Sequence, residues 1–338
     1  MSAPTALLVA DAPAEWDALR ALERAATPAH DPRVWAALAA TLPGFEAKFV
    51  SVHDGARFLG GAPLLIERRG FGTWLHALPF LLSGAPLARR GHEALVDAVV
   101  ADAIERTAGE LGASGGEWAC DRPGAPVAPE ALDRVGGETR WFESARVALD
   151  AGLDAAWHAV DRKARQEIAH AGAAGLAFVE APEAFDDAYA LHAHQSRRWA
   201  GHRALPAALS RRLLDDGAAR LFVVRDARGV LCATLALDGA HETFVWWSGA
   251  HDAARARRAY PVLMWGVATW AAARGRARLN LGASTGLDAV AAFKRALGAK
   301  PSRYPVRWLD ARHASALGRT LAAVQRRLRR GRARGAAA

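Results

Sequence analysis

Three apolar segments follow one another in the second half of the chain, and each has the length of a strand. They are Arg220–Arg225, Val230–Leu237 and Glu242–Ser248, and a turn with the sequence Asp-Ala-Arg-Gly separates the first two. Runs of about four to eight such residues bounded by turn signals are typical of β-strands. The pattern therefore predicts three consecutive antiparallel strands.

After these strands the chain alternates between the period of a helix and that of a strand. Pro261–Arg274 is apolar at helical spacing, and Arg278–Leu281 alternates polar and apolar residues. A turn of small residues follows, in which Thr285 is a candidate N-cap with Asp288 three residues later. Gly298 predicts the end of this second helix.

The same rules give the remaining elements. Helices are predicted at Glu15–Ala26, Pro32–Leu42, His92–Leu111, Asp154–Gly172, Pro182–Trp199 and Pro206–Asp216. Strands are predicted at Phe45–Val52, Arg57–Glu67, Glu117–Cys120, Glu138–Leu149, Leu176–Glu180 and Tyr304–Leu309. The segment between Asp121 and Gly137 is predicted to be a loop.

The composition indicates two folded domains. A chain of 338 residues exceeds the usual size of one domain, and its 51% hydrophobic share argues against extended disorder. We expect domains at residues 1–150 and 151–310, and a tail at residues 311–338. The two cysteines lack metal-ligand spacing, and the histidines of the segment His192, His194 and His202 do not share one helix face, so no metal site is expected.

The positive charge is concentrated at the C-terminal end. Eight of the formal net charges of +9 correspond to arginines of residues 311–338, where there is no acidic residue. Leu317, Leu321, Val324 and Leu328 recur there at helical spacing, which predicts an amphipathic helix with an arginine face. Its expected partners are an anionic membrane surface, RNA or another acidic molecule, and a solvated basic tail is the alternative.

No segment has the pattern of a secretory signal. The apolar run Ala6–Ala10 has no positive residue before it, and the uncharged stretch Gly70–Ala88 is interrupted by glycine and proline. We therefore expect a cytoplasmic protein that can be peripheral at the inner face of the membrane.

Lys294 is a candidate functional residue because lysine is rare in this chain. There are four lysines, Lys48, Lys163, Lys294 and Lys300, among 44 basic residues. An ammonium group is compact, and its pKa responds to burial, unlike that of a guanidinium group. The alternative is that Lys294 merely places a cation near a helix C-terminus.

The order of the predicted elements in the second half resembles the Gcn5-related N-acetyltransferase (GNAT) fold, and the first half resembles a looser copy of it. The segments Arg162–Glu180 and Phe293–Leu309 resemble those of the Fem-type aminoacyltransferases and of the CelD/BcsL-type acetyltransferases. The resemblance covers nearly the whole chain. It implies an α+β protein with tandem GNAT-like domains, each a mostly antiparallel twisted sheet flanked by helices.

The resemblance implies N-acyl transfer to an amine, on an amino sugar, a peptide or another cell-envelope or exopolysaccharide precursor, with the site between the two halves. In the Fem-type pattern the lysine after the phenylalanine stabilises the reacting carbonyl, which corresponds to Lys294 beside Phe293. The implied co-substrate is acyl-CoA or acetyl-CoA. Alternatives are an aminoacyl-tRNA-dependent peptidoglycan aminoacyltransferase and a non-catalytic partner in an envelope assembly.

The segment that would bind the donor departs from the GNAT pattern. Most GNAT proteins that use acetyl-CoA hold its pyrophosphate with a glycine-rich loop before the third helix. Here the loop reads Gly-Ala-His-Asp-Ala-Ala-Arg-Ala-Arg-Arg-Ala-Tyr-Pro and lacks those glycines. Its candidate donor-binding or phosphate-binding residues are Arg255, Arg257, Arg258 and Tyr260, together with Ser284 after the next strand.

The sequence leaves the general base and the substrate pocket open. Asp288 and Glu242 are candidate bases because both lie near strand ends or turns of the second domain. Trp246, Trp247 and Trp265 are candidate pocket residues, since tryptophan combines a broad apolar face with an N–H donor. Tryptophans at strand and helix spacing are also typical of a core.

Overall fold

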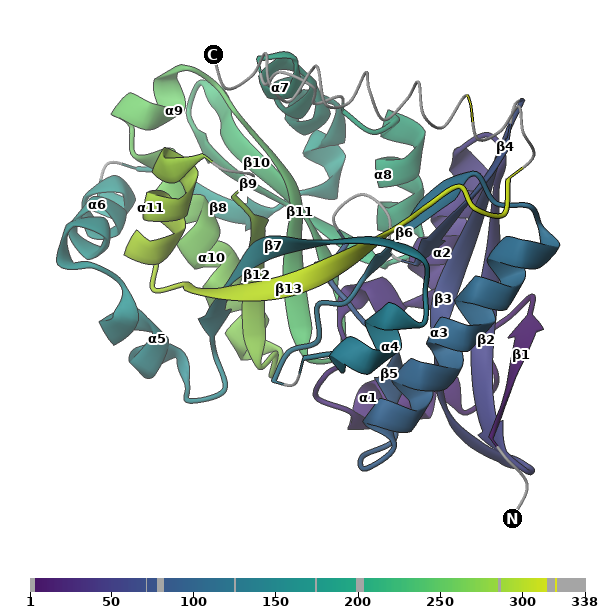
Figure 1. Cartoon of the computed structure of the whole chain (residues 1–338). Helices are drawn as coiled ribbons and strands as arrows, with labels where there is room; N and C mark the ends of the chain where they lie inside the picture. Colours follow the sequence, from purple (N-terminus) through teal and green to yellow (C-terminus); the bar gives the residue numbers. More distant parts are fainter. Residues whose placement is uncertain are drawn as a thin grey trace. The chain divides into compact units, whose positions relative to one another are not determined.

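The computed structural model describes residues 4–70, 72–77, 82–124, 126–173, 175–198, 204–284, 287–314 and 320. The chain divides into two compact units (Figure 1). Unit 1 comprises Met1–Phe142 and Tyr304–Ala338, and unit 2 comprises Glu143–Arg303. Strands β7 (Gly137–Ala148) and β13 (Lys300–Leu309) each contribute to both units. The domain boundaries expected after residues 150 and 310 stay predictions.

Unit 1 contains strands in the order β1-β2-β3-β4-β6-β13, and in the part of it that the structure describes only β4 and β6 pair in parallel. Its other strands are β1 (Thr5–Val9), β2 (Phe45–Asp54), β3 (Arg57–Arg69), β4 (Gly72–Ala77), β5 (Leu87–Ala88) and β6 (Gly115–Ala119). Its helices are α1 (Trp16–Leu22), η1 (Pro28–His30), α2 (Pro32–Thr41), α3 (Glu93–Glu110) and α4 (Pro129–Asp133).

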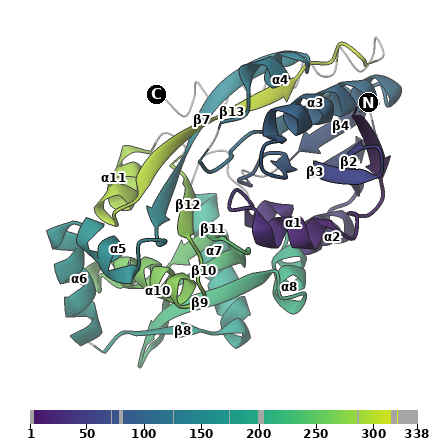
Figure 2. The same cartoon turned by 90° about the horizontal axis from the view of Figure 1, so that it is seen from below.

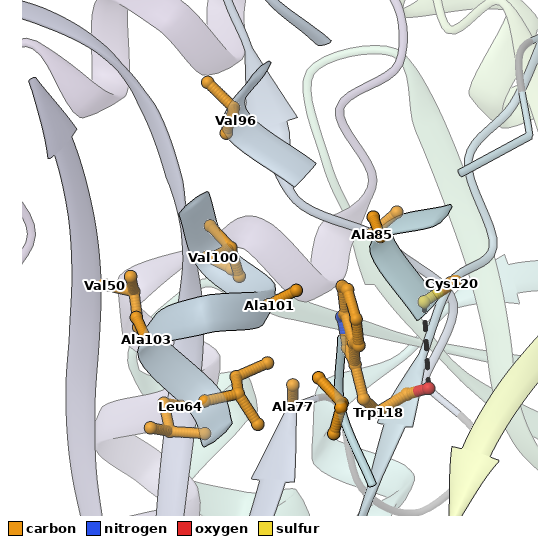
Figure 3. Close-up of a cluster of buried hydrophobic side chains, with 14 of the residues drawn as sticks. Val50, Leu64, Ala77, Ala85, Val96, Val100, Ala101, Ala103, Trp118 and Cys120 are labelled. Carbon is orange, nitrogen blue, oxygen red and sulfur yellow. Dashed lines mark hydrogen bonds between the residues drawn. The ribbon is translucent and has the colours of Figure 1, made fainter. Parts of the chain in front are cut away.

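The core of unit 1 lies between α3 and one face of its sheet. Val96, Val100 and Ile104 recur at helical spacing and are at most 1% exposed. They pack in one cluster with Leu64 of β3 and Trp118 of β6 (Figure 3). Apolar burial on one stripe of a helix and one face of a sheet explains why these segments pack together.

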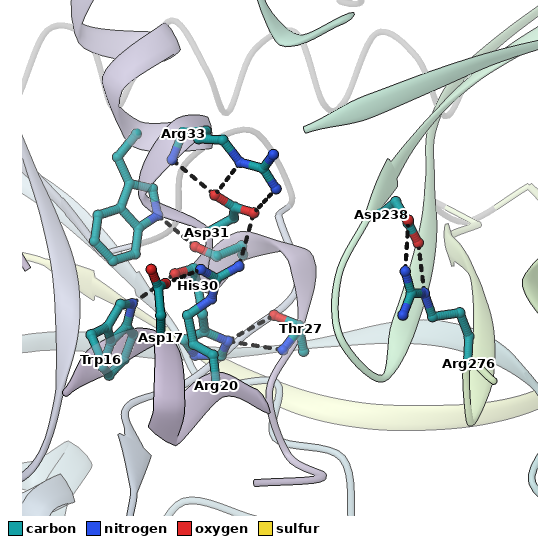
Figure 4. A network of polar contacts seen from close by, with 11 residues as sticks. Trp16, Asp17, Arg20, Thr27, His30, Asp31, Arg33, Asp238 and Arg276 are labelled. Atoms are coloured by element: carbon teal, nitrogen blue, oxygen red, sulfur yellow. Dashed lines mark hydrogen bonds and ion pairs between the residues drawn. The ribbon is translucent and has the colours of Figure 1, made fainter. Parts of the chain in front are cut away.

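His30 is the centre of a buried hydrogen-bond network in unit 1 (Figure 4). The Thr27 N–H donates to His30 Nδ1 at 2.9 Å, so Nδ1 is the acceptor and Nε2 carries the hydrogen that reaches the Ala85 carbonyl. Burial lowers the pKa of His30 to about 4. The ring is therefore neutral at neutral pH.

The segment Leu82–Pro86 has no regular secondary structure, yet all five residues are buried. Buried loops are unusual because their main-chain polar groups need partners. Here the partners come from distant parts of the sequence. Thr27 donates to the Ser83 carbonyl, Asp121 N–H to Gly84, His30 to Ala85, and Arg122 to Pro86.

Unit 2 contains strands in the order β7-β12-β11-β10-β9-β8, and among its described residues only β11 and β12 pair in parallel. Its other strands are β8 (Ala177–Glu180), β9 (Ala219–Asp226), β10 (Gly229–Asp238), β11 (Glu242–Ala250) and β12 (Arg278–Ala283). Its helices are α5 (Leu153–Ala159), α6 (Arg162–Ala173), η2 (Pro182–Ala184), α7 (Phe185–Arg197), α8 (Ala207–Asp215), α9 (Ala253–Ala256), α10 (Ala259–Ala273) and α11 (Asp288–Ala296).

Helices cover both faces of the unit 2 sheet (Figure 2). Leu263 and Val267 of α10 pack in one cluster with Cys232 and Ala236 of β10. On the other face α7 crosses β11 at Gly249, where a side chain would overlap the main chain of α7. Arg276, between α10 and β12, forms a two-pronged ion pair with Asp238 at the end of β10, with both N–O distances at 2.9 Å (Figure 4).

Besides short elements such as α9, several segments differ from the elements expected from the sequence. The single helix expected at residues 154–172 is wrong: α5 and α6 are separate, because Val160 is extended and buried and Asp161 N–H donates to the Ala296 carbonyl. Arg165 covers the carbonyls freed at this break. The loop expected after Asp121 contains the short helix α4, and the strand β1 was not anticipated.

No helix in the described part of the chain is long and apolar enough to cross a membrane.

Candidate functional site

The two parallel strands of unit 2 pair over only three residues each. Glu242, Thr243 and Phe244 of β11 lie opposite Arg278, Leu279 and Asn280 of β12, and no further pairs follow although both strands continue. Beyond this point the main-chain N–H and C=O groups of β11 and β12 no longer pair with each other. The end of such a pairing is a common place for a ligand in mixed sheets.

β11 is irregular immediately beyond that point. Leu235 of β10 lies opposite Trp247, but the next residue, Ala236, lies opposite Val245. Trp246 is therefore the extra residue of a β-bulge. Bulges interrupt pairing and re-aim side chains, and they are frequent beside active sites.

β12 has a bulge as well, at Gly282. Asn280 lies opposite Arg146 of β7 and Ala283 lies opposite Ser144, so two residues of β12 face one residue of β7. Gly282 has a φ of +71°, which is the left-handed conformation that glycine adopts without strain. The bulge turns the carbonyls of Gly282 and Ala283 towards α11.

Lys294 of α11 donates to both of these carbonyls. Its Nζ lies 2.8 Å from the Gly282 oxygen and 2.9 Å from the Ala283 oxygen, and the residue is 7% exposed. Burial lowers the pKa of Lys294 to about 8, while the charge of Glu143 acts in the opposite direction. The position near the helix C-terminus agrees with the prediction, but the ammonium turns inwards to the end of β12.

Glu242 occupies a structural position at the start of β11. It is fully buried, and its Oε2 accepts from Arg278 Nε at 2.6 Å and from Arg146 Nε at 3.1 Å. Its Oε1 accepts from Asn280 Nδ2 at 3.1 Å. Both oxygens of this buried carboxylate are thus occupied by side chains of β7 and β12. The geometry therefore gives Glu242 the role of an ion-pair centre rather than that of a general base.

Phe293 and Tyr260 lie against each other beside Lys294. Their ring centroids are 5.3 Å apart. Burial raises the pKa of Tyr260 to about 12, and its hydrogen bond with Ser248 acts in the opposite direction. Ser248 Oγ in turn donates to Thr234 Oγ1 at 3.0 Å. Tyr260 thus connects the first turn of α10 to β11 and to α11.

The three arginines before α10 have different surroundings. Arg257 pairs with Asp226 at 3.0 Å, whereas Arg255 and Arg258 are exposed and have no side-chain partner in the described part of the chain. Arg258 has a φ of +55°, the one positive φ of a described residue other than glycine. Such a conformation costs ~1 kcal/mol in a residue with a side chain and is frequent at functional sites.

The three candidate pocket tryptophans do not lie together. Trp247 is buried between β11 and α7, where it stacks on His192 at 4.6 Å and donates to Ser210 Oγ at 3.0 Å. Trp265 packs on Trp157 at 4.7 Å and borders an apolar void with a volume of about 10 Å³, the size of one water molecule. Trp246 is half-buried at the bulge. Trp247 is therefore a core residue, and Trp265 is a half-buried residue packed against the core of unit 2.

The remaining predicted site residues lie at the ends of the loop between β12 and α11. Ser284 is 9% exposed, and its carbonyl accepts from Leu287 N–H. Asp288 is exposed in the first turn of α11. The predicted N-cap Thr285 lies outside the described residues. No group of three His, Cys, Asp or Glu side chains suited to a metal ion occurs among the residues that the structure describes.

Sequence reasoning missed the residues that hold this site in place. Asn280, Arg146 and Arg278 all contact Glu242, and Asn280 also contacts the Gly282 bulge. Arg146 belongs to a strand more than 130 residues before Asn280 in the sequence, so no local pattern links them. The one local signal is Asn280 itself, a polar residue at a buried position of an apolar strand.

The comparisons with known proteins agree with this architecture. Residues 158–295, which lie within unit 2, match the family of acetyltransferase (GNAT) domains. The structure is similar to the crystal structure of FemX, with a TM-score of 0.70 and 12% identity over 89% of this chain and 96% of that chain. No curated protein sequence matches the chain.

Two further solved structures have the same fold. A tandem GNAT protein from the clavulanic acid biosynthesis pathway matches with a TM-score of 0.52 and 14% identity, over 90% of this chain and 98% of that one. A conserved protein of unknown function from Bacteroides thetaiotaomicron matches with a TM-score of 0.54 and 9% identity, over 89% and 98%. The prediction of an α+β chain with tandem GNAT-like halves is confirmed. Residues 158–295 thus carry an acetyltransferase (GNAT) domain, and the chain as a whole has a fold similar to that of FemX and of a tandem GNAT protein.

Proposed function

We propose that this protein is an N-acyltransferase that moves an acyl group from an activated donor to an amine, at the end of the parallel pairing of β11 and β12. The observation that supports the proposal most is the concentration of special features at that point. Both strands carry a bulge there, and the buried Lys294 points its ammonium group at one of them. Acyl transfer needs such fixed donors where an oxyanion develops.

Lys294 is suited to stabilise that oxyanion. An ammonium group has three N–H donors, and two of them are used by the carbonyls of Gly282 and Ala283. These two bonds fix the position of the nitrogen, and the third hydrogen can reach a substrate oxygen. Because the nitrogen is already held in place, little reorganisation is needed during the reaction.

The start of α10 is suited to hold a donor that carries phosphate. The first turn of a helix presents free N–H groups and the positive end of the helix dipole, which favour anions. Arg255 and Arg258 are exposed at this turn, and neither is neutralised by a carboxylate of the described residues. We propose acyl-CoA, including acetyl-CoA, as the donor, and an amino sugar, a peptide or another cell-envelope precursor as the acceptor.

Thermal stabilisation by candidate donors tests the first half of this proposal. We expect acetyl-CoA or a longer acyl-CoA to stabilise the protein by ~2.7 kcal/mol at 100 times its Kd. The double variant Arg255→Gln/Arg258→Gln should lose most of this stabilisation. The matched double variant Arg57→Gln/Arg90→Gln, which changes two exposed arginines of unit 1, should keep it.

The absence of a shift with every thioester would contradict acyl-CoA as the donor. Stabilisation by aminoacyl-tRNA under the same conditions would instead favour the Fem-type aminoacyltransferase. If no donor binds at all, a non-catalytic role in an envelope assembly would be favoured.

Substitution of Lys294 tests the proposed role of this residue in the reaction. We expect Lys294→Ala to lower kcat by ~10²- to 10³-fold in a variant that still folds, since this is the usual cost of removing one oxyanion donor. Lys300→Ala is the matched control, because Lys300 is exposed six residues later. Unchanged turnover in folded Lys294→Ala would remove Lys294 from the reaction.

We also propose that the basic tail binds an anionic membrane surface, which would bring the enzyme to envelope precursors. The apolar positions Leu317, Leu321, Val324 and Leu328 support a membrane rather than RNA, because an apolar stripe gains free energy in a lipid interface but not on a phosphate backbone. The start of the tail is attached to α3, since Arg312 and His313 both contact Glu105.

A further inference from the structure

The buried amide of Asn280 occupies a position that the proposed reaction has not explained. Asn280 is fully buried, and both ends of its side chain are used. Its Oδ1 accepts from Gly282 N–H at 2.8 Å, and its Nδ2 donates to Glu242 Oε1 at 3.1 Å. The assignment of oxygen and nitrogen follows from Gly282, because a main-chain N–H only donates and the amide atom that faces it must therefore be the oxygen.

We propose that Asn280 is a positioning residue that fixes the Gly282 bulge and thereby places the two carbonyls that orient Lys294. The catalytic meaning of this role rests on the proposed function, but the placement itself does not. Asn280 touches neither Lys294 nor the expected position of the substrate. It acts through the main chain of Gly282 and Ala283.

Three strands hold Asn280 in turn. One carboxylate oxygen of Glu242 in β11 accepts hydrogen bonds from Arg278 of β12 and Arg146 of β7. The other oxygen accepts the hydrogen bond from Asn280. Ser144 Oγ accepts from Arg146 Nη1 at 2.8 Å. A buried ion pair whose remaining lone pairs are satisfied is rigid, and breaking one partner leaves an uncompensated charge.

Substitution of Asn280 should therefore change the surroundings and the pKa of Lys294. Without the amide, Gly282 N–H has no acceptor, and the bulge can relax to satisfy it. The two carbonyls would then turn away, and water would reach the ammonium group. Since burial is what lowers the pKa of Lys294, hydration should return it towards the ordinary lysine value of about 10.4.

Competitive labelling of lysines with acetic anhydride, read by mass spectrometry as a function of pH, measures this effect without any need for enzyme activity. In the unchanged protein Lys294 should titrate near pH 8, and the exposed Lys300 serves as an internal reference for labelling. In Asn280→Ala, and in the milder Asn280→Ser, the midpoint of Lys294 should rise by ~1 pH unit or more. The other charged groups near Lys294 are Glu143 of β7 and, on its own helix, Asp288 and Arg295, and none of these variants changes them.

Two glycine variants provide a matched pair. Gly282→Ala strains the bulge itself and places a Cβ 3.3 Å from Phe244, so it should also raise the midpoint of Lys294. Gly275→Ala introduces the same backbone strain, at a φ of +71°, in open space at another turn, and should leave the midpoint unchanged. These two variants still test whether the bulge at Gly282 sets the pKa of Lys294 if Asn280→Ala does not fold.

A midpoint near pH 8 in folded Asn280→Ser would overturn the proposal. A raised midpoint in all variants, Gly275→Ala included, would also overturn it, because the effect would then reflect general loosening. If labelling follows the expectation but no variant or parent transfers an acyl group, the proposed function fails and the positioning role stands. In an active enzyme the alkaline limb of the pH profile of kcat should shift upwards with the labelling midpoint, because the ammonium form of Lys294 is the active one, whereas KM for the donor should not shift.

Discussion

At the residue scale, His30 links the protonation of one side chain to the stability of unit 1. Its two ring nitrogens are used by the Thr27 N–H and the Ala85 carbonyl, and the residue is 1% exposed. Protonation would place a second hydrogen on Nδ1, opposite an N–H that already points there. The imidazole must therefore stay neutral while the network is intact.

This requirement predicts a loss of stability in mild acid. Burial lowers the pKa of His30 to about 4 in the folded state, whereas the unfolded value is about 6.5. The folded state thus binds fewer protons, and its stability is fully present above pH 6.5 and falls as the pH drops towards 4, by ~3 kcal/mol. Urea unfolding of His30→Gln should lack this part of the acid dependence.

His194→Gln is the control, since His194 is exposed on α7. An identical decline between pH 6.5 and pH 4 in His30→Gln and the parent protein would contradict the assigned tautomer and its consequences.

Single residues of the site were predictable to the extent that a local pattern placed them. The position of Lys294 near the end of a helix follows from Gly298 and the helical spacing before it. Its partners do not follow, because a β-bulge and the register of β7 on β12 depend on residues far apart in sequence. Glu242 was assigned a chemical role from its turn position, and the two arginines that neutralise it come from other strands.

At the element scale, the crossing of α7 over β11 depends on one glycine. Glycine inside a strand often marks a close approach of another backbone, and the sequence shows Gly249 but not its neighbour. A Cβ at Gly249 would overlap the main chain of Leu191 and His192. We expect Gly249→Ala to lower the free energy of unfolding by ~1 to 3 kcal/mol, as for other overpacked contacts.

Gly70→Ala is the matched control for denaturant unfolding, because a Cβ at Gly70 meets no atom within 4 Å. Equal midpoints for the two variants would show that α7 can move away from β11 at little cost.

Most regular elements of the chain were predictable because their periods are clear. The hairpin of β2 and β3 follows from the Asp54-Gly55 turn, and α2 begins at Pro32 with Asp31 accepting from the Arg33 N–H, as its sequence predicts. The break between α5 and α6 was not predictable, since the helical pattern continues through Val160 and only the contact with Ala296 stops it. Tertiary contacts decide such cases over propensity.

At the scale of the whole molecule, the chain returns to its first unit at the end. The last residues of β13 pair with β6, so unit 1 contains both the early and the final described segments. Domains predicted from sequence are consecutive ranges of residues, so they do not include a unit formed by two ranges that are far apart in the chain. The basic tail therefore starts from unit 1, where Arg312 and His313 contact Glu105. Burial alone would raise the pKa of Glu105, but hydrogen bonds from Arg312, Gly136 and His313 lower it to about 2.

Vesicle sedimentation tests the membrane proposal for this tail. The full chain should bind vesicles of phosphatidylglycerol and phosphatidylcholine and not vesicles of phosphatidylcholine alone, since each arginine near an anionic surface contributes ~1 kcal/mol. Binding should weaken strongly at 0.5 M salt, where screening is short-ranged, at ~4 Å. A variant without residues 315–338 keeps Arg312 and His313 and should not sediment.

Sedimentation of that shortened variant with anionic vesicles would place the membrane contact elsewhere on the protein. Retention of the full chain on RNA at physiological salt, without binding to vesicles, would favour the nucleic acid as the partner.

The buried segment Leu82–Pro86 also sets an order of events for folding. Three of its carbonyls accept hydrogen bonds from the side chains of Thr27, His30 and Arg122, which lie 36 to 56 residues away in the sequence. Contacts between residues this far apart carry a larger loop-closure entropy than those within helices and hairpins, so we expect the segment to become ordered only after both of its flanking parts are in place. Its completion is therefore a late step that joins the N-terminal helices of unit 1 to the end of β6. Hydrogen exchange at Asp121 N–H, which opens only when this step reverses, reports on the cooperative unfolding of the whole unit.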